Sequence, residues 1–235
     1  FATSSFIMTF QLRDKSVLVT GGTGVLGTAV VSALLAEGGV CHVATRDAGT
    51  NQSEGRLITH QVDLLDEASV SAMYEGIDGL WASIHVAGGF AMAPIEKTSG
   101  AEMRKMFDLN TMTVFHCCKS AVTQMRKNGK TGGRIVNVAA RPAVTPTPGM
   151  IAYATSKAAA TSITQSLAEE LRAEGILVNA VLPSLMDSPA NRAAMPDADH
   201  NVWPKAEEVA RAILFLASPL NALTTGSLMP VYGKV

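Results

Sequence analysis

Tyr153 and Lys157 stand four positions apart in the stretch YATSK, so a helix places the phenol and the ammonium on one face. A nearby ammonium lowers the pKa of a phenol toward working pH, which suits the phenol to proton transfer. The alternative is an accidental pair on a surface helix. The pair becomes a candidate catalytic site only if the fold places it beside a bound cofactor.

A glycine-rich turn predicts such a cofactor. The stretch TGGTGVLG follows a short β-rich run and opens a segment of helical periodicity. Glycines there permit a tight turn and bring a pyrophosphate close to the amides of a helix N-terminus, although glycine turns also end strands for purely structural reasons. In this context dinucleotide binding is the favoured interpretation, and it assigns cofactor contacts to Gly21, Gly22, Thr23, Gly24, Val25, Leu26 and Gly27.

The end of the second predicted strand favours NADP over NAD. Thr45 and Arg46 stand where an acid would bind the ribose 2′-hydroxyl of NAD, and a hydroxyl beside a guanidinium suits a 2′-phosphate better. Asp47 keeps NAD as an alternative, and Arg46 could be a solvated loop charge. Asp63, followed by Leu64, is placed to meet the adenine, although it could equally cap the next helix.

Strands alternate regularly with helices along the whole chain. Strands are predicted at residues 16–20, 40–45, 57–62, 79–89, 133–139, 177–183 and 227–233, and helices at 27–39, 66–74, 102–128, 153–175 and 205–219. This alternation predicts an α/β fold of the Rossmann type, with a doubly wound, mostly parallel sheet and helices on both faces. The one long segment without periodicity, 184–204, is expected to be a functional lid or a disordered loop.

The length and composition of the chain limit the classes of protein to which it can belong. With 235 residues, 47% of them hydrophobic, we expect one domain over 8–235, preceded by an expression remnant at 1–7. A formal charge of −1 without a basic stripe argues against nucleic acid, and no apolar run is long enough to span a membrane. Three scattered cysteines predict neither disulfides nor a metal site, and hence reduced thiols in a cytoplasmic protein.

Further motifs extend these observations to most of the chain: HVAGG at 85–89, Asn110 in FDLNTM, VNAVLP ending at Pro183, and the tail TGSLMPVYG. In this order the chain, from Gln11 to Lys234, resembles the short-chain dehydrogenase/reductase family. The resemblance implies a nicotinamide oxidoreductase that forms homodimers or homotetramers. It gives Tyr153 the role of general acid/base. It implies that Lys157 binds the nicotinamide ribose and that Asn110 supports a proton relay through water. It also implies cofactor contacts at Ala87, Gly88, Gly89 and Pro183.

Three positions depart from the pattern of that family, and the third bears on the substrate. Val25 occupies a position of the turn that is usually glycine, and Val86 a position where a side-chain amide usually braces neighbouring strands. Ala140 occupies the position of the serine that usually orients the substrate. Residues 145–204 resemble the dihydropteridine reductases, a branch of the family that reduces quinonoid dihydropterins without that serine. We therefore expect substrate contacts at Ala140, Phe90, Met150, Met186 and Trp203.

The favoured function is an NAD(P)H-dependent reductase of a quinonoid small molecule. The first alternative is a generic carbonyl or alcohol oxidoreductase in which Thr145, Thr147 or a backbone amide replaces the serine. The second is a cofactor-binding protein that has lost its chemistry, since a missing catalytic side chain can signal lost activity. Retention of Asn110, Tyr153 and Lys157 argues against the second alternative.

Overall fold

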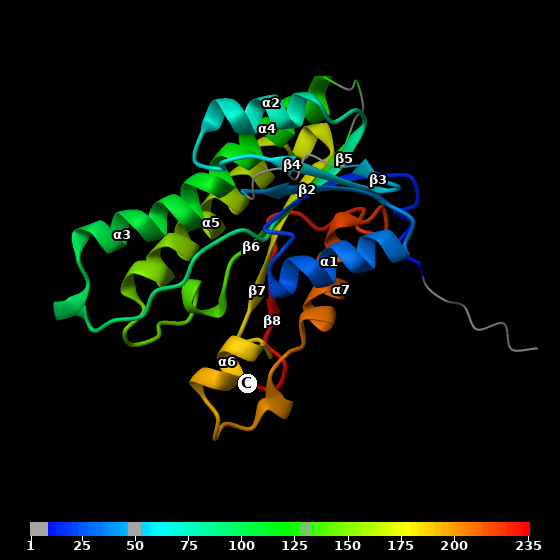
Figure 1. Cartoon of the computed structure of the whole chain (residues 1–235). Coiled ribbons are helices and arrows are strands. Elements are labelled where there is room, and N and C mark those ends of the chain that lie inside the picture. The colour runs from blue at the N-terminus through cyan, green and yellow to red at the C-terminus, as the bar shows by residue number, and fades with distance from the viewer. Residues whose placement is uncertain (1–8, 47–52, 128, 130–131) are drawn as a thin grey trace, which may run out of the picture.

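The computed structural model describes residues 9–46, 53–127, 129 and 132–235. The proposed expression remnant at 1–7 and the alternative ribose ligand Asp47 therefore lie outside the described residues. Within them the chain builds one sheet with helices on both faces, as Figure 1 shows. This arrangement confirms the predicted α/β fold.

The sheet has eight strands in the order β3-β4-β2-β1-β5-β6-β7-β8. All neighbours are parallel except β3 and β4, which form a short antiparallel pair at one edge that the sequence did not predict. The central strands are buried on both faces, which explains why they are nearly continuous apolar runs. The strands are β1 (Ser16–Thr20), β2 (Val40–Thr45), β3 (Ser53–Glu54), β4 (Leu57–Gln61), β5 (Leu80–His85), β6 (Gly133–Val138), β7 (Ile176–Pro183) and β8 (Leu228–Val231).

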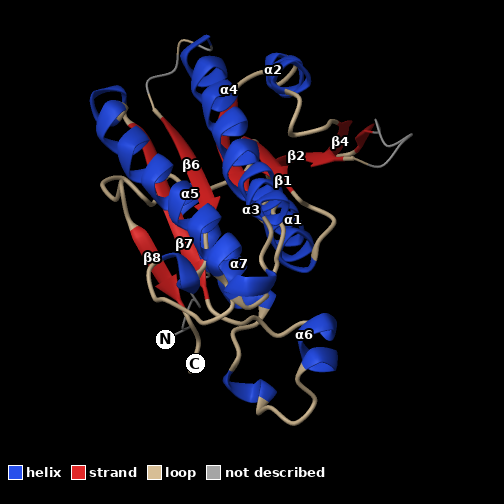
Figure 2. Cartoon of the chain, turned by 90° about the vertical axis from the view of Figure 1, so that its left-hand side faces the viewer, coloured by secondary structure: helices blue, strands red, loops and turns tan. Residues whose placement is uncertain are grey.

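Two apolar clusters bind the helices to the sheet. One joins Leu18 and Ile135 to α2, α4 and α5, and the other joins Val17 and Val136 to α1 and α7 on the opposite face. Figure 2 shows α4 and α5 lying across the first of these faces. The helices are α1 (Val25–Ala36), α2 (Glu67–Glu75), α3 (Gly100–Phe107), α4 (Thr113–Lys127), α5 (Ile151–Glu170), α6 (Pro189–Ala194) and α7 (Ala206–Ala217).

Two predictions of secondary structure need correction. The helix expected at 102–128 is divided into α3 and α4 by a π-helical segment, Asp108–Met112, and such widened turns often occur at functional sites. The segment 184–204 is not a structureless loop, because it contains α6 and a 3-10 turn at His200–Val202. Ser188 begins α6 by accepting a hydrogen bond from the Asn191 amide.

The strand order creates a crevice between β1 and β5. From β1 the chain proceeds outward to β2 and β4, whereas from β5 it proceeds in the opposite direction to β6, β7 and β8. Ligands of open α/β sheets bind at such a switch point, beyond the carboxyl ends of the strands. Thr20 and His85, paired across β1 and β5, mark the floor of this crevice.

The described part of the chain contains no helix long and apolar enough to cross a bilayer. Across residues 9–46, 53–127, 129 and 132–235, no group of three or more potential metal ligands comes together. The three cysteines Cys41, Cys117 and Cys118 are free and buried.

Candidate active site

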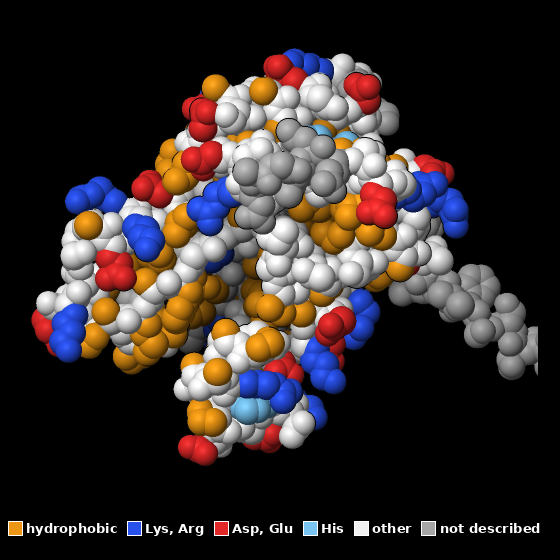
Figure 3. Space-filling view, viewed as in Figure 1, with side chains coloured by type: hydrophobic (Ala, Val, Ile, Leu, Met, Phe, Trp, Pro, Cys, Tyr) orange, Lys and Arg blue, Asp and Glu red, His pale blue; other side chains and the backbone are white. Residues whose placement is uncertain are grey.

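A cavity of about 1230 Å³ lies over the carboxyl ends of the central strands. Figure 3 shows it as a hollow between the main body and the segment that contains α6, with hydrophobic side chains along its rim. The predicted site residues that line it are Gly21, Thr23, Gly24, Val25, Leu26, Gly27, Thr45, Arg46, Asp63, Leu64, Ala87, Gly88, Gly89, Phe90, Ala140, Met150, Tyr153, Lys157, Pro183 and Met186. Gly22, Asn110 and Trp203 are not among the lining residues.

The glycine turn fits a dinucleotide for reasons of space. Gly21 has φ +66, and a Cβ there would lie 2.7 Å from the Ala87 amide nitrogen across the crevice. A Cβ on Gly27 would lie 2.0 Å from the Gly21 carbonyl oxygen. Gly24 begins α1 without a side-chain cap, so no side chain competes with an anion for the first amides of the helix. Val25 projects into the same space and is 50% exposed.

The end of the cavity expected to hold the nucleotide is formed by β2 and the segment after β4. Thr45 is buried at the last position of β2, and the exposed Arg46 follows it. The carboxylate of Asp63 accepts a hydrogen bond from the Leu65 amide at 3.0 Å. The cap of α2 is Asp66, which accepts from Ala68. The alternative role of Asp63 as the cap of that helix is therefore wrong, and its side chain borders the cavity.

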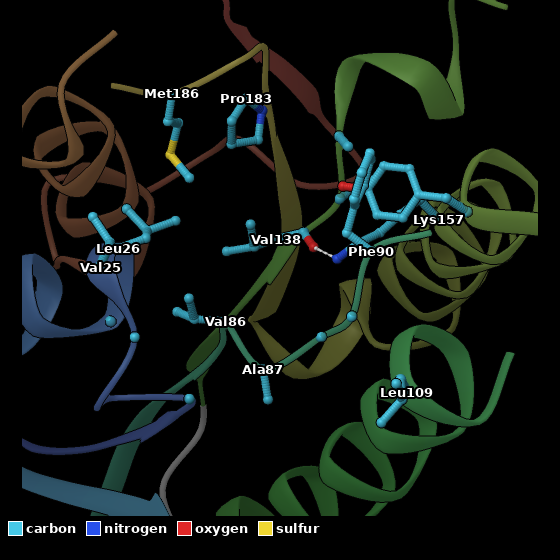
Figure 4. Close-up of a pocket in the computed structure, with 18 of the residues that line it drawn as sticks. Val25, Leu26, Val86, Ala87, Phe90, Leu109, Val138, Lys157, Pro183 and Met186 are labelled. Carbon is cyan, nitrogen blue, oxygen red and sulfur yellow. Dashed lines mark hydrogen bonds between the residues drawn. The ribbon is translucent and has the colours of Figure 1, made fainter. Parts of the chain in front are cut away.

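Lys157 is the buried cation of the site. Its side chain crosses from α5 to the end of β6, where Nζ donates a hydrogen bond of 2.7 Å to the Val138 carbonyl, as Figure 4 shows. Burial lowers the pKa of the Lys157 ammonium from 10.5 to about 8. The pKa of the ammonium therefore lies close to neutral pH, and a nearby anion or hydrogen-bond acceptor would raise it again.

The pKa of the Tyr153 phenol differs from the sequence-based expectation. We expected the lysine to lower the phenol's pKa, but burial raises the pKa of Tyr153 to about 12. The Tyr153 ring meets Phe90 edge to face, with 5.0 Å between the ring centroids, and this contact shields one side of the phenol from water. Desolvation therefore sets the pKa of this phenol, which remains protonated at neutral pH.

Asn110 supports the site from behind the cavity wall. Its side chain is fully buried, accepts from the Gly89 amide at 2.9 Å, and donates to the Gly89 carbonyl and to Ser156 Oγ. A Cβ on Gly88 would lie 2.6 Å from Asn110 Oδ1 and 3.2 Å from Lys157 Nζ. Asn110 therefore holds the glycine loop against the lysine, and its expected part in a water relay stays a prediction.

The substrate end of the cavity is mainly apolar. Ala140 is 5% exposed and forms part of its wall without a side-chain donor, and Met150 also lines the cavity. Met186, expected at the substrate, lines the cavity beside Pro183 and packs against the cluster that contains Leu26. Trp203, expected at the substrate, does not line the cavity: it is buried at the end of the 3-10 turn, with 4.5 Å between its ring centroid and that of His200. Its position after a Pro- and Asp-rich segment gave no signal that the ring would turn inward.

Several lining residues were not predicted from the sequence. They belong to the wide turn after α3, the first residue of α4, the segment after Ala140 and the start of α6: Leu109, Thr113, Arg141, Pro146, Ser188 and Asn191. The break in the long helix gave no sequence signal. The polar residues of 184–204 could have indicated which part of that segment faces a ligand.

Replacing Lys157 with methionine is expected to stabilise the unliganded protein at neutral pH while removing activity. Because the folded chain holds this proton less tightly than the unfolded chain, burying the ammonium costs on the order of 3 kcal/mol. This loss of folding free energy is fully present below about pH 8 and disappears as the pH rises through 10.5, where the unfolded chain also loses the proton. Thermal unfolding of both proteins at neutral and alkaline pH measures it, and a Tm difference that does not shrink with rising pH would contradict the expectation.

Comparisons with known proteins found relatives in sequence and in fold. A family model described as short chain dehydrogenase matches residues 15–199. The uncharacterised oxidoreductase YgfF of Escherichia coli strain K12 is 32% identical over 92% of this chain and 98% of its own. The 3alpha-hydroxysteroid dehydrogenase of Mediterraneibacter gnavus is 29% identical, covering 96% and 98%. The solved structure of ElxO with NADP bound, 23% identical, superposes with a TM-score of 0.86 over 94% of this chain and 98% of ElxO, a likeness of fold.

Proposed function

This chain belongs to the short-chain dehydrogenase/reductase family and is an NAD(P)-dependent oxidoreductase, and from that premise we propose that it is an NADPH-dependent reductase. Its proposed substrate is a flat quinonoid small molecule of the dihydropterin kind, in preference to a simple ketone. The observation that carries the proposal is the meeting, in one cavity, of the glycine turn, the half-buried phenol of Tyr153 and the buried ammonium of Lys157 with a wall that lacks the usual serine hydroxyl.

In the proposed reaction Lys157 and Tyr153 have different roles. A bound nicotinamide cofactor supplies the hydride. Lys157, whose ammonium is already desolvated, binds the ribose hydroxyls and stabilises negative charge near the phenol. Tyr153, protonated at neutral pH because burial raises its pKa to about 12, donates its proton to the substrate atom that accumulates charge. A protonated phenol favours reduction over oxidation, because oxidation would require the phenolate as the base.

The substrate wall supports the quinonoid choice. Ala140 offers no donor to a developing alkoxide, while Phe90 and Met150 offer apolar surface to a flat ring. A generic carbonyl oxidoreductase remains the second candidate, because Thr145 and Thr147 also line the cavity and the relative from Mediterraneibacter gnavus is named as a hydroxysteroid dehydrogenase. The test is NADPH oxidation with a panel of quinonoid and carbonyl acceptors. Binding of NADPH without turnover of any acceptor would favour the non-catalytic alternative.

NADPH is expected to bind more tightly than NADH. Arg46 is exposed beside the buried Thr45 at the end of β2, where a guanidinium can pair with a 2′-phosphate. A charged hydrogen bond of this kind is worth roughly 1.5–3 kcal/mol. Titration of both nucleotides by intrinsic fluorescence, on the wild type and on Arg46→Ala, measures the difference.

The matched control for that titration is Arg211→Ala, which removes an exposed arginine from α7, outside the cavity. The control should leave both affinities unchanged. Equal affinities of the wild type for the two nucleotides, or an Arg46→Ala variant that keeps its NADPH affinity, would contradict the assignment of Arg46.

We also propose that the chain assembles as a homodimer or homotetramer. The support is the exposed apolar surface of its helices, including Phe115 on α4, which is 42% exposed, and Ile151 on α5, which is 45% exposed. Light scattering on the purified protein measures the mass directly, and a monomer at micromolar concentration would refute the proposal.

A further inference from the structure

A chain of buried polar side chains lies below the candidate active site. The Tyr74 hydroxyl lies 2.7 Å from Ser83 Oγ, and Ser83 Oγ lies 2.8 Å from His85 Nε2. His85 Nδ1 lies 2.7 Å from Asn137 Oδ1, and Asn137 Nδ2 donates to Thr164 Oγ1 at 2.9 Å. Each of these five residues is at most 1% exposed. We call Tyr74, Ser83, His85, Asn137 and Thr164 the polar chain.

The direction of the hydrogen bonds between Thr164, Asn137 and His85 can be derived from one end. Thr164 donates its only hydroxyl proton to the Ala160 carbonyl, so it must accept from the Asn137 amide. This fixes Asn137 Oδ1 toward His85, which must then donate from Nδ1. His85 Nε2 is left as an acceptor, with the Ser83 hydroxyl at 2.8 Å and the Tyr74 hydroxyl at 3.3 Å as its two possible donors.

The titratable groups in and around the polar chain do not change protonation state near neutral pH. Burial lowers the pKa of His85 to about 4, so the ring is neutral with one proton on Nδ1. Burial also raises the pKa values of Tyr74 on α2 and of the Cys117 and Cys118 thiols on α4. All of these groups therefore keep one protonation state, and the hydrogen bonds from Asn137 to Thr164 and from His85 to Asn137 keep one direction.

The polar chain reaches the active site at the carbonyl that holds Lys157. His85 and Asn137 are paired neighbours on β5 and β6. Asn137 directly precedes Val138, whose carbonyl accepts from Lys157 Nζ at 2.7 Å. Thr164 lies on α5 two turns beyond Lys157, so the Asn137–Thr164 bond joins the strand and the helix that carry the two partners of that contact.

We propose that His85 and Asn137 are positioning residues that set the separation between the end of β6 and α5, and thereby hold the Val138 carbonyl against the Lys157 ammonium. The role rests on the proposed function, in which Lys157 must remain charged beside the phenol. The polar chain replaces the brace that Val86 cannot provide, since its side chain has no hydrogen-bonding group. Loosening the polar chain removes a hydrogen-bond acceptor from the ammonium, which favours the neutral amine.

The test measures the protonation of Lys157 directly, by lysine-labelled NMR of the unliganded full chain. Loss of one resonance in Lys157→Met assigns the signal, which should titrate near pH 8 in the wild type. His85→Leu and Thr164→Val, which break the polar chain at its middle and at its end, should each lower that midpoint by roughly 0.5–1 pH unit. His85→Gln keeps a donor and an acceptor and should restore most of the wild-type value.

Thr161→Val is the matched control, because its hydroxyl donates only to the Ala158 carbonyl within the same helix. It should leave the midpoint unchanged. If Thr164→Val folds with a wild-type midpoint, the polar chain is only structural and the proposal is overturned; this variant decides the matter even if His85→Leu does not fold. The readout needs no substrate, so a shifted midpoint in a protein that reduces no acceptor would uphold the positioning role and refute the proposed function.

Discussion

A Tyr153→Phe variant is expected to lose on the order of 10²-fold or more in kcat while it still binds NADPH, because a positioned acid contributes about that factor. The substitution removes only the hydroxyl. The ring remains, and with it the edge-to-face contact with Phe90 at 5.0 Å between centroids. The wall of the cavity should therefore keep its shape, and the loss should be chemical. Steady-state kinetics together with a fluorescence titration of NADPH separate the two quantities.

The control for this variant is Tyr232→Phe. Tyr232 lies outside the cavity lining, and its ring faces the Arg141 guanidinium at 5.1 Å. Its hydroxyl should contribute nothing to turnover. Reduction by Tyr153→Phe at the wild-type rate would show that the phenol is a bystander and that some other group delivers the proton.

The fold could be predicted because its signals are local. β2 was expected at 40–45 and is observed at Val40–Thr45, since a strand buried on both faces is an unbroken apolar run between turn residues. The cofactor turn was predictable for the same reason. Steric demands such as that at Gly27, where a Cβ would lie 2.0 Å from a carbonyl oxygen, leave glycine as the only choice.

What the sequence did not predict depends on contacts between distant segments. The raised pKa of Tyr153 follows from burial beneath Phe90 and the neighbouring loops, and no spacing of residues encodes that burial. The inward turn of Trp203 has the same origin. The pairing of His85 with Asn137 across two strands requires the register of β5 and β6, which alternation alone leaves open.

The polar chain also changes what the missing amide at Val86 means. From the sequence, its absence indicated a weaker brace between strands. In the structure the residue before it, His85, makes the connection to Asn137 at 2.7 Å. A departure from a family pattern at one position can therefore be offset by its neighbour.

The substrate wall leads to the prediction that separates the two candidate functions. Reduction of a ketone places charge on one oxygen, and removing one donor from such an oxygen typically costs about 10²–10³ in rate. Ala140 supplies no donor there. A quinonoid ring instead regains aromatic character on reduction and spreads the incoming charge over several heteroatoms, so a single phenol can suffice. We therefore expect a quinonoid dihydropterin to be reduced with a far higher kcat/KM than aliphatic or aryl ketones.

An Ala140→Ser variant tests the reason for that preference. A serine hydroxyl at this wall position would give a ketone oxygen its missing donor, whereas the delocalised charge of a reduced pterin has less need of one. The variant should therefore improve kcat/KM for ketones more than for the pterin. Ala140→Gly, which alters the wall without adding a donor, is the matched control and should not raise ketone reduction. Brisk ketone reduction by the wild type, with no turnover of the pterin, would mean that Thr145, Thr147 or a backbone amide already serves as the donor.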